Sequence, residues 1–76
     1  MSDFWERQQR TELAEMAGIQ PNHLSEILHR KRGVGKDLAR KLYKTSELVL
    51  GYAIPFEAWL FNKTTKHPGF FEDPIT

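Results

Sequence analysis

Cysteine is absent from this chain of 76 residues, and so is any apolar run long enough to span a bilayer. Without cysteine there is no disulfide framework and no thiolate metal site, and nothing indicates an oxidising compartment. No apolar stretch reaches about 18 residues, and the amino terminus lacks a basic segment followed by an apolar one. These absences argue against a membrane span and a secretory signal, and we expect a cytoplasmic protein.

Signatures of catalysis and of metal binding are missing as well. The sequence contains no nucleophile elbow, phosphate loop or acid pair. His23 and His29 are six residues apart on one expected helix, whereas a spacing of three or four would bring two imidazoles together on a metal. We therefore predict that the protein is not an enzyme and has no cofactor or metal site.

An excess of charge of one sign is also lacking, since the net charge is only +1. The charge is unevenly divided, however. Residues 1–29 carry two basic and five acidic residues, residues 30–45 carry seven basic and one acidic, and residues 46–76 carry two basic and four acidic. A concentrated basic segment is typical of proteins that contact nucleic-acid phosphates.

Residues 10–29 have the spacing of two short helices joined by a tight turn. Leu13, Ala14, Met16 and Ala17 follow a helical repeat that stops at Gly18, and glycine just past a helix end adopts the left-handed conformation without strain. Pro21 suits the first position of the next helix. In that helix Leu24, Ile27 and Leu28 share one face, so the opposite face is expected to be exposed.

This segment resembles the helix-turn-helix of phage repressors and Cro proteins, the XRE family. In the family's motif of twenty residues, position 5 is small, position 9 is glycine and five other positions are apolar. Ala14 and Gly18 match the first two, and the apolar positions are Leu13, Ala17, Ile19, Leu24 and Ile27. LARKL at 38–42 looks like the family's fourth helix, so the resemblance covers roughly residues 4–50. Arg30 is a departure, because family members often have glycine just after the recognition helix.

The resemblance implies that bases are read mainly from the first turn of the recognition helix and from one residue a turn later. Asn22 can pair bidentately with adenine, and Gln20 can do likewise or bond a phosphate. Glu26 can accept from cytosine N4, and the alternative is an i,i+4 ion pair with Arg30. The predicted base-reading residues are Gln20, Asn22, Ser25, Glu26 and His29.

Phosphate contacts are expected on either side of this helix. Arg10 matches the family's phosphate-clamping position, and Arg30 begins the basic segment that follows the helix. The predicted phosphate-binding residues are Arg10, His23, Arg30, Lys31, Arg32 and Lys36. For Arg40, Lys41 and Lys44, phosphate contact and a solvated helix face remain equally open.

The fold class expected from these patterns is all-α, a compact five-helix lambda-repressor-like domain with an irregular carboxyl-terminal tail. Asp3 and Glu6 have the spacing of a capping arrangement for a short first helix containing Phe4 and Trp5. Lys36 to about Lys44 forms the fourth helix, and Ser46 is a candidate cap for a fifth. We predict a DNA-binding domain over residues 1–61 and a tail over residues 62–76, anchored by Phe70 and Phe71.

The stretch from Leu48 to Phe61 holds eleven apolar residues out of fourteen, which is too many to leave fully exposed. It can serve as core or as a surface between two copies of the chain. Proteins of this architecture commonly bind two half-sites as dimers, so we expect a homodimer. The candidate interface residues are Leu50, Tyr52, Ile54, Phe56 and Trp59.

The function predicted from the sequence is that of a bacterial or phage transcriptional regulator which inserts residues 21–29 into the major groove of double-stranded DNA. The alternative is a helix-turn-helix adaptor or antitoxin whose carboxyl-terminal third, chiefly residues 48–61, binds a protein partner. The modest charge and the aromatic residues of that third favour the alternative.

Overall fold

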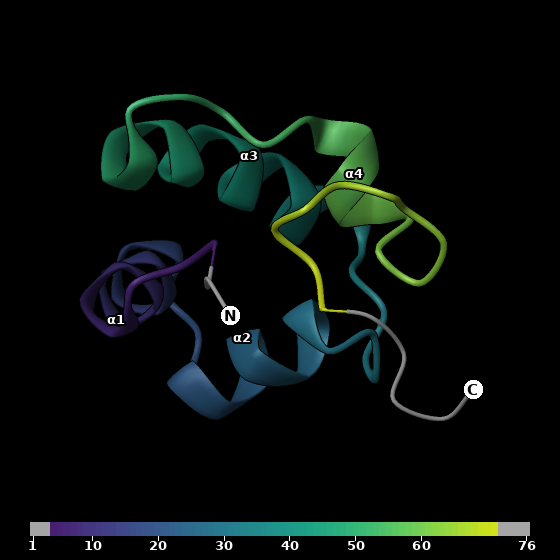
Figure 1. Ribbon diagram of the computed structural model, residues 1–76, viewed down its shortest axis with the longest axis horizontal. Helices are drawn as coiled ribbons and strands as arrows, with labels where there is room; N and C mark the ends of the chain where they lie inside the picture. The colour runs from purple at the N-terminus through teal and green to yellow at the C-terminus, as the bar shows by residue number, and fades with distance from the viewer. Residues whose placement is uncertain (1–3, 72–76) are drawn as a thin grey trace.

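Four helices make up the fold of residues 4–71, the part of the chain that the computed structural model describes. They are α1 (Arg7–Ala17), α2 (Pro21–Leu28), α3 (Lys36–Leu50) and α4 (Phe56–Leu60), and this range contains no strand. In Figure 1, α2 lies on the opposite side of the molecule from α3 and α4. α1 packs against both α2 and α3, and α3 packs against α4. The all-helical prediction is confirmed, with four helices in the described range where five were expected.

The separate first helix is one part of that prediction that is wrong. Asp3 lies outside the described residues, and Phe4 and Trp5 precede α1 without being helical. Glu6 has extended backbone angles and caps α1, and its N–H donates to Oε1 of Gln9 at 3.0 Å. Trp5 is instead drawn into the core, where it is 2% exposed and its Nε1 donates to the carbonyl oxygen of Gly69 at 2.7 Å.

The turn between α1 and α2 follows the predicted design. Gly18 has φ +77°, and its N–H donates to the carbonyl of Glu15 at 3.1 Å, while the N–H of Ile19 donates to that of Ala14 at 2.9 Å. These bonds satisfy two carbonyls in the last turn of α1, and α2 begins three residues after α1 ends. Ala14 is fully buried, as expected of a small residue where the two helices approach each other.

α3 is longer than predicted because nothing between Lys36 and Leu50 interrupts a helix. Its sequence contains no glycine or proline, and it ends at Gly51, which adopts a left-handed φ of +87°. Ser46 is therefore inside the helix and does not cap another one. Its buried hydroxyl donates to the carbonyl of Tyr43 and accepts from the N–H of Ile54, both at 2.9 Å. This pair of bonds holds the chain that follows Gly51 against α3.

The core includes residues from both ends of the described chain. Ile54 and Trp59 are 0% exposed, and Phe70 is 4% exposed and meets the Trp59 ring edge to face at 5.1 Å. Residues 62–71 form turns without a helix, yet they return from α4 to the end of α2 (Figure 1). The N–H of Phe71 donates to the carbonyl of Leu28 at 2.9 Å. The predicted anchoring of this segment by Phe70 and Phe71 is confirmed.

His67 organises the turn inside that segment. Its Nδ1 accepts from the N–H of Gly69 at 2.9 Å, and its ring meets Phe4 edge to face at 5.5 Å. Burial lowers the pKa of His67 below its usual 6.5. Because Nδ1 must be free to accept, the folded state favours the neutral ring with its proton on Nε2.

We expect the free energy of unfolding to fall as the pH is lowered from 7.5 to 5.5, and to fall less in His67→Asn. The unfolded chain takes up the His67 proton first as the pH drops below about 6.5, so the contribution of the neutral ring is complete above that value and is lost toward the folded-state pKa. The asparagine Oδ1 retains an acceptor but does not titrate. Urea unfolding at both pH values measures the difference, with His23→Asn as the matched control. Equal pH dependence in wild type and His67→Asn would contradict the assignment.

Candidate nucleic-acid interface

α2 is held to the core by one face and offers the other to solvent. Leu24, Ile27 and Leu28 are at most 1% exposed. Pro21 occupies the first turn after the cap Gln20, where its missing N–H removes no helical bond. The structure places Gln20 and Asn22 among the exposed residues, and it leaves three of the predicted base-reading residues half-buried: Ser25, Glu26 and His29.

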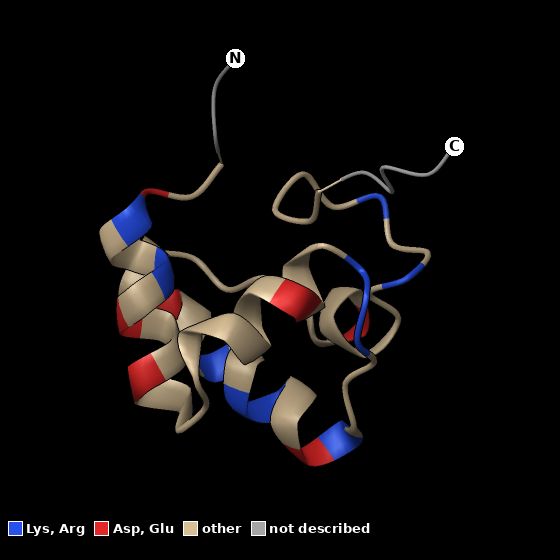
Figure 2. Ribbon diagram, turned by 90° about the horizontal axis from the view of Figure 1, so that it is seen from below, with Lys and Arg blue, Asp and Glu red and all other residues tan. Residues whose placement is uncertain are grey.

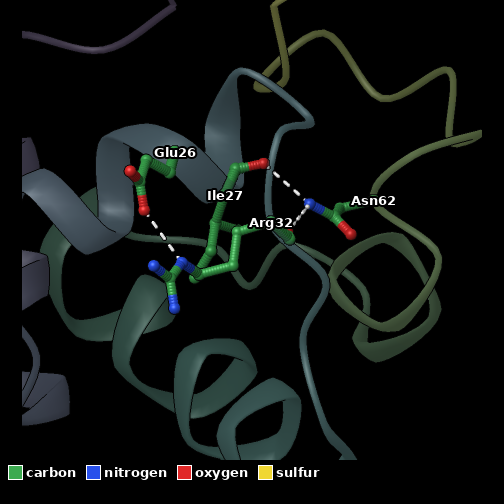
Figure 3. A network of polar contacts seen from close by, with 4 residues as sticks. All are labelled: Glu26, Ile27, Arg32 and Asn62. Carbon is green, nitrogen blue, oxygen red and sulfur yellow. Dashed lines mark hydrogen bonds and ion pairs between the residues drawn. The ribbon is translucent and has the colours of Figure 1, made fainter.

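Glu26 is paired with a cation, but not with the one expected. Its Oε1 lies 2.8 Å from Nε of Arg32, with about half of each side chain exposed. Figure 3 shows this contact reaching from α2 to the loop that follows it. Arg30, the partner suggested by the i,i+4 spacing, points elsewhere. A pair this exposed contributes about 0–1 kcal/mol to stability, so a competing ligand can separate it at little cost.

Arg30 takes the place of the expected glycine in both position and conformation. Its φ of +65° is the only positive value at a non-glycine residue in the described chain. The side chain reaches across to the carboxyl-terminal segment, where Nε donates to the carbonyl of Phe71 at 2.6 Å and Nη1 donates to that of Asn62 at 2.9 Å. Two of its three guanidinium nitrogens are thus engaged, so Arg30 has a structural role beside any phosphate contact.

Asn62 closes the same junction from the other side. It is 1% exposed, and its Nδ2 donates to the carbonyls of Ile27 at 2.8 Å and Arg32 at 2.9 Å (Figure 3). One amide group therefore provides a hydrogen-bond donor both to a carbonyl near the end of α2 and to a carbonyl in the loop beyond it. The sequence pattern did not single out this residue, and the available signal was a polar side chain directly after the apolar stretch 48–61. His29 is also held here, because its ring stacks on Phe71 at 4.3 Å.

At the other end of α2 a small cavity separates the first turn from α1. Its volume is about 140 Å³, and it is lined by Arg7, Arg10, Thr11, Pro21, Leu24 and Ser25. Nε of Arg10 is buried and has no hydrogen-bond partner within residues 4–71. A buried donor beside a second guanidinium suits a bound oxyanion. Arg7 escaped prediction because the motif was taken to start at Arg10, whereas α1 starts one turn earlier.

Basic residues lie on both sides of α2. Figure 2 shows Lys and Arg on α1 to one side of α2 and on the loop after α2 to the other side. Lys31, Arg32 and Lys36 are exposed in or just after that loop, and His23 is half-buried on α2. Arg40, Lys41 and Lys44 are exposed on α3, which packs on α1 and α4 and not on α2. The cations nearest α2 thus come from α1 and from residues 30–36.

The candidate dimer residues fall into different environments. Ile54 and Trp59 are completely buried, so the core interpretation holds for their side chains, which offer no surface to a second copy. Leu50 and Phe56 are half-buried, and Tyr52 is 49% exposed. Other apolar side chains near them in sequence are exposed: Tyr43, Leu48 and Phe61.

Residues 4–71 contain no group of three or more histidine, cysteine, aspartate or glutamate side chains placed to hold a metal ion. No helix in this range is both long enough and apolar enough to cross a membrane.

Comparison of the chain with protein-family models, with curated proteins and with solved structures finds no match.

Replacing Arg30 separates its backbone conformation from its side-chain bonds. Arg30→Ala and Arg30→Gly both lose the guanidinium, and we expect both to be less stable than wild type. Alanine must still adopt the left-handed conformation, which costs about 1 kcal/mol that glycine avoids. In urea unfolding, the free energy of unfolding of the glycine variant should therefore be about 1 kcal/mol higher than that of the alanine variant. If the two variants unfold at the same urea concentration, the left-handed backbone contributes no strain.

Proposed function

We propose that the protein is a sequence-specific DNA-binding transcriptional regulator of the bacterial and phage repressor type, with a lambda-repressor-like helix-turn-helix. The observation that carries the proposal is the exposed face of α2, which follows α1 through a three-residue turn and is flanked by cations on both sides (Figure 2). An α-helix of this kind fits the major groove of B-DNA, and the flanking cations lie where phosphates border that groove.

Base reading is assigned to the first turn of α2 and to the residues a turn later. Asn22 is exposed and has an amide that can donate to and accept from adenine. Gln20 precedes it, and Ser25, Glu26 and His29 continue the face toward the carboxyl end. The ion pair between Glu26 and Arg32 bears on this assignment, because it turns the carboxylate toward the loop. Contact between Glu26 and cytosine would require that exposed pair to open.

Anchoring to phosphates is assigned to two places. The cavity between α1 and α2 brings Arg7 and Arg10 beside the positive end of the α2 dipole, which favours an anion. On the far side of α2 the side chain of Lys31 is exposed and can turn toward a phosphate. Arg30 is a less direct candidate, since its guanidinium holds the carboxyl-terminal segment.

A homodimer accompanies this proposal, because repressors of this architecture read two half-sites related by two-fold symmetry. Leu48 is 72% exposed and Tyr52 49% exposed, and both lie in the apolar stretch 48–61. Single exposed apolar side chains are common, but several in one short stretch favour a contact surface.

The same exposed side chains favour a second candidate function, that of an adaptor or antitoxin which binds a protein partner through residues 48–61. Affinity for random duplex DNA separates the two proposals. A DNA-binding protein loses that affinity steeply as salt rises, whereas an adaptor has little affinity to lose.

Selection of bound sites from random DNA identifies the operator, on which two variants then test the two assigned roles. We expect Asn22→Ala to cost about 1–3 kcal/mol in operator affinity and to relax preference at one base pair. Lys31→Ala should weaken binding to all sequences alike. It should also reduce the slope of log affinity against log salt concentration by about one. Gln8→Ala, which removes an exposed amide from α1, and Lys63→Ala, which removes an exposed lysine outside the predicted phosphate-binding residues, are the matched controls. Unchanged affinity and preference in Asn22→Ala would place the reading face elsewhere.

Sedimentation tests the dimer. We expect wild type to sediment as a dimer at high micromolar concentration, and Leu48→Glu to shift it toward monomer because a carboxylate would be buried in the contact. Met16→Glu is the matched control, since Met16 is 52% exposed on α1. Wild type that stays monomeric with and without operator would reject the dimer.

A further inference from the structure

A cleft lies where the carboxyl-terminal segment returns to the end of α2. Its volume is about 500 Å³, and it is lined by Arg30, Thr65, Lys66, His67, Pro68 and Phe70. This volume is far larger than that of the cavity between α1 and α2, and it falls within the range of about 300–1,000 Å³ typical of small-molecule sites.

The polar groups around the cleft are mostly hydrogen-bond donors. Arg30 and Lys66 contribute cations, and no lining residue carries a carboxylate. The bond from the N–H of Gly69 occupies Nδ1 of His67, so the neutral ring carries its proton on Nε2 and is a donor there. Pro68 and Phe70 supply apolar wall beside these donors.

Several contacts hold Arg30 and His67 in place without a ligand. The Arg30 guanidinium is fixed by the carbonyls of Asn62 and Phe71. The His67 ring is enclosed by Phe4 at 5.5 Å and Phe70 at 6.1 Å, both edge to face. The hydroxyl oxygen of Thr65 accepts from the N–H of His67 at 3.2 Å, which shapes the turn. Prearranged donors lower the ordering cost of binding.

We propose that this cleft binds the oxyanion of a small organic molecule, either a phosphate monoester or a carboxylate. The cations attract the oxyanion, charge-assisted hydrogen bonds orient it, and the Pro68 and Phe70 walls accept the apolar part of the same ligand. None of the predicted base-reading residues lines the cleft, although the last of them, His29, directly precedes Arg30.

A ligand here would touch Arg30, two residues past the end of α2, because Arg30 both lines the cleft and carries the left-handed turn. Binding would therefore alter DNA affinity, and this effect on DNA, unlike the site itself, rests on the proposed function. A ligand can change DNA affinity only as far as it binds the free and DNA-bound forms differently.

The test is a titration of the ¹⁵N-labelled full chain with phenyl phosphate, benzoate and inorganic phosphate, each at constant ionic strength against chloride. We expect saturating shifts at the backbone amides of residues 65–67, 69 and 70 and at the Arg30 side chain. Phenyl phosphate or benzoate should bind several-fold more tightly than inorganic phosphate, and the stronger of the two identifies the oxyanion class. Lys66→Gln should weaken binding at least about fivefold, and Lys63→Gln, also an exposed lysine, should leave it unchanged.

Shifts that do not saturate, shifts of equal size in Lys66→Gln, or saturation confined to Arg7 and Arg10 would overturn the site. Operator binding is then measured with the best ligand at saturation, and unchanged operator affinity would overturn the effect on DNA. If the cleft binds its ligand but no DNA sequence is bound, the proposed function fails while the site remains.

Discussion

The left-handed backbone of Arg30 is the constraint on which the end of α2 depends. An arginine resists this conformation by about 1–2 kcal/mol, and its own guanidinium offsets that cost by donating to the carbonyls of Asn62 and Phe71. The same residue therefore turns the chain out of α2 and ties the carboxyl-terminal segment to it. Asn62 completes the junction through the carbonyls of Ile27 and Arg32. Residues far apart in sequence thus hold the helix that we propose to read DNA.

The contacts that hold α2 in place lie next to the two proposed sites. α2 packs against α1, and its last turn is bonded to the returning segment, so its solvent face has a defined direction. The cavity beside Arg10 and the donor-lined cleft beside Arg30 lie at opposite ends of the helix.

Much of the fold was accessible from the sequence because its signals are local. The stop at Gly18, the start at Pro21 and the buried face of α2 follow from backbone preference and helical repeat. The prediction of a separate first helix was wrong because tertiary packing draws Trp5 into the core. There its indole N–H donates to the carbonyl of Gly69, 64 positions away in the sequence. Ser46 was misread as a cap because a serine inside a helix has the same local signature as one that begins it.

At the candidate site, the amino-acid order is enough to predict which residue types occupy α2 and that a basic segment follows it. Which of those residues are free depends on contacts between distant segments. The tertiary structure paired Glu26 with Arg32, committed Arg30 to the carboxyl-terminal segment, placed Ile54 and Trp59 in the core, and added Arg7 beside Arg10. The physical reason is that helical periodicity is set by neighbours within about four residues, whereas ion pairs, buried amides and clefts depend on segments that meet only after the chain has folded.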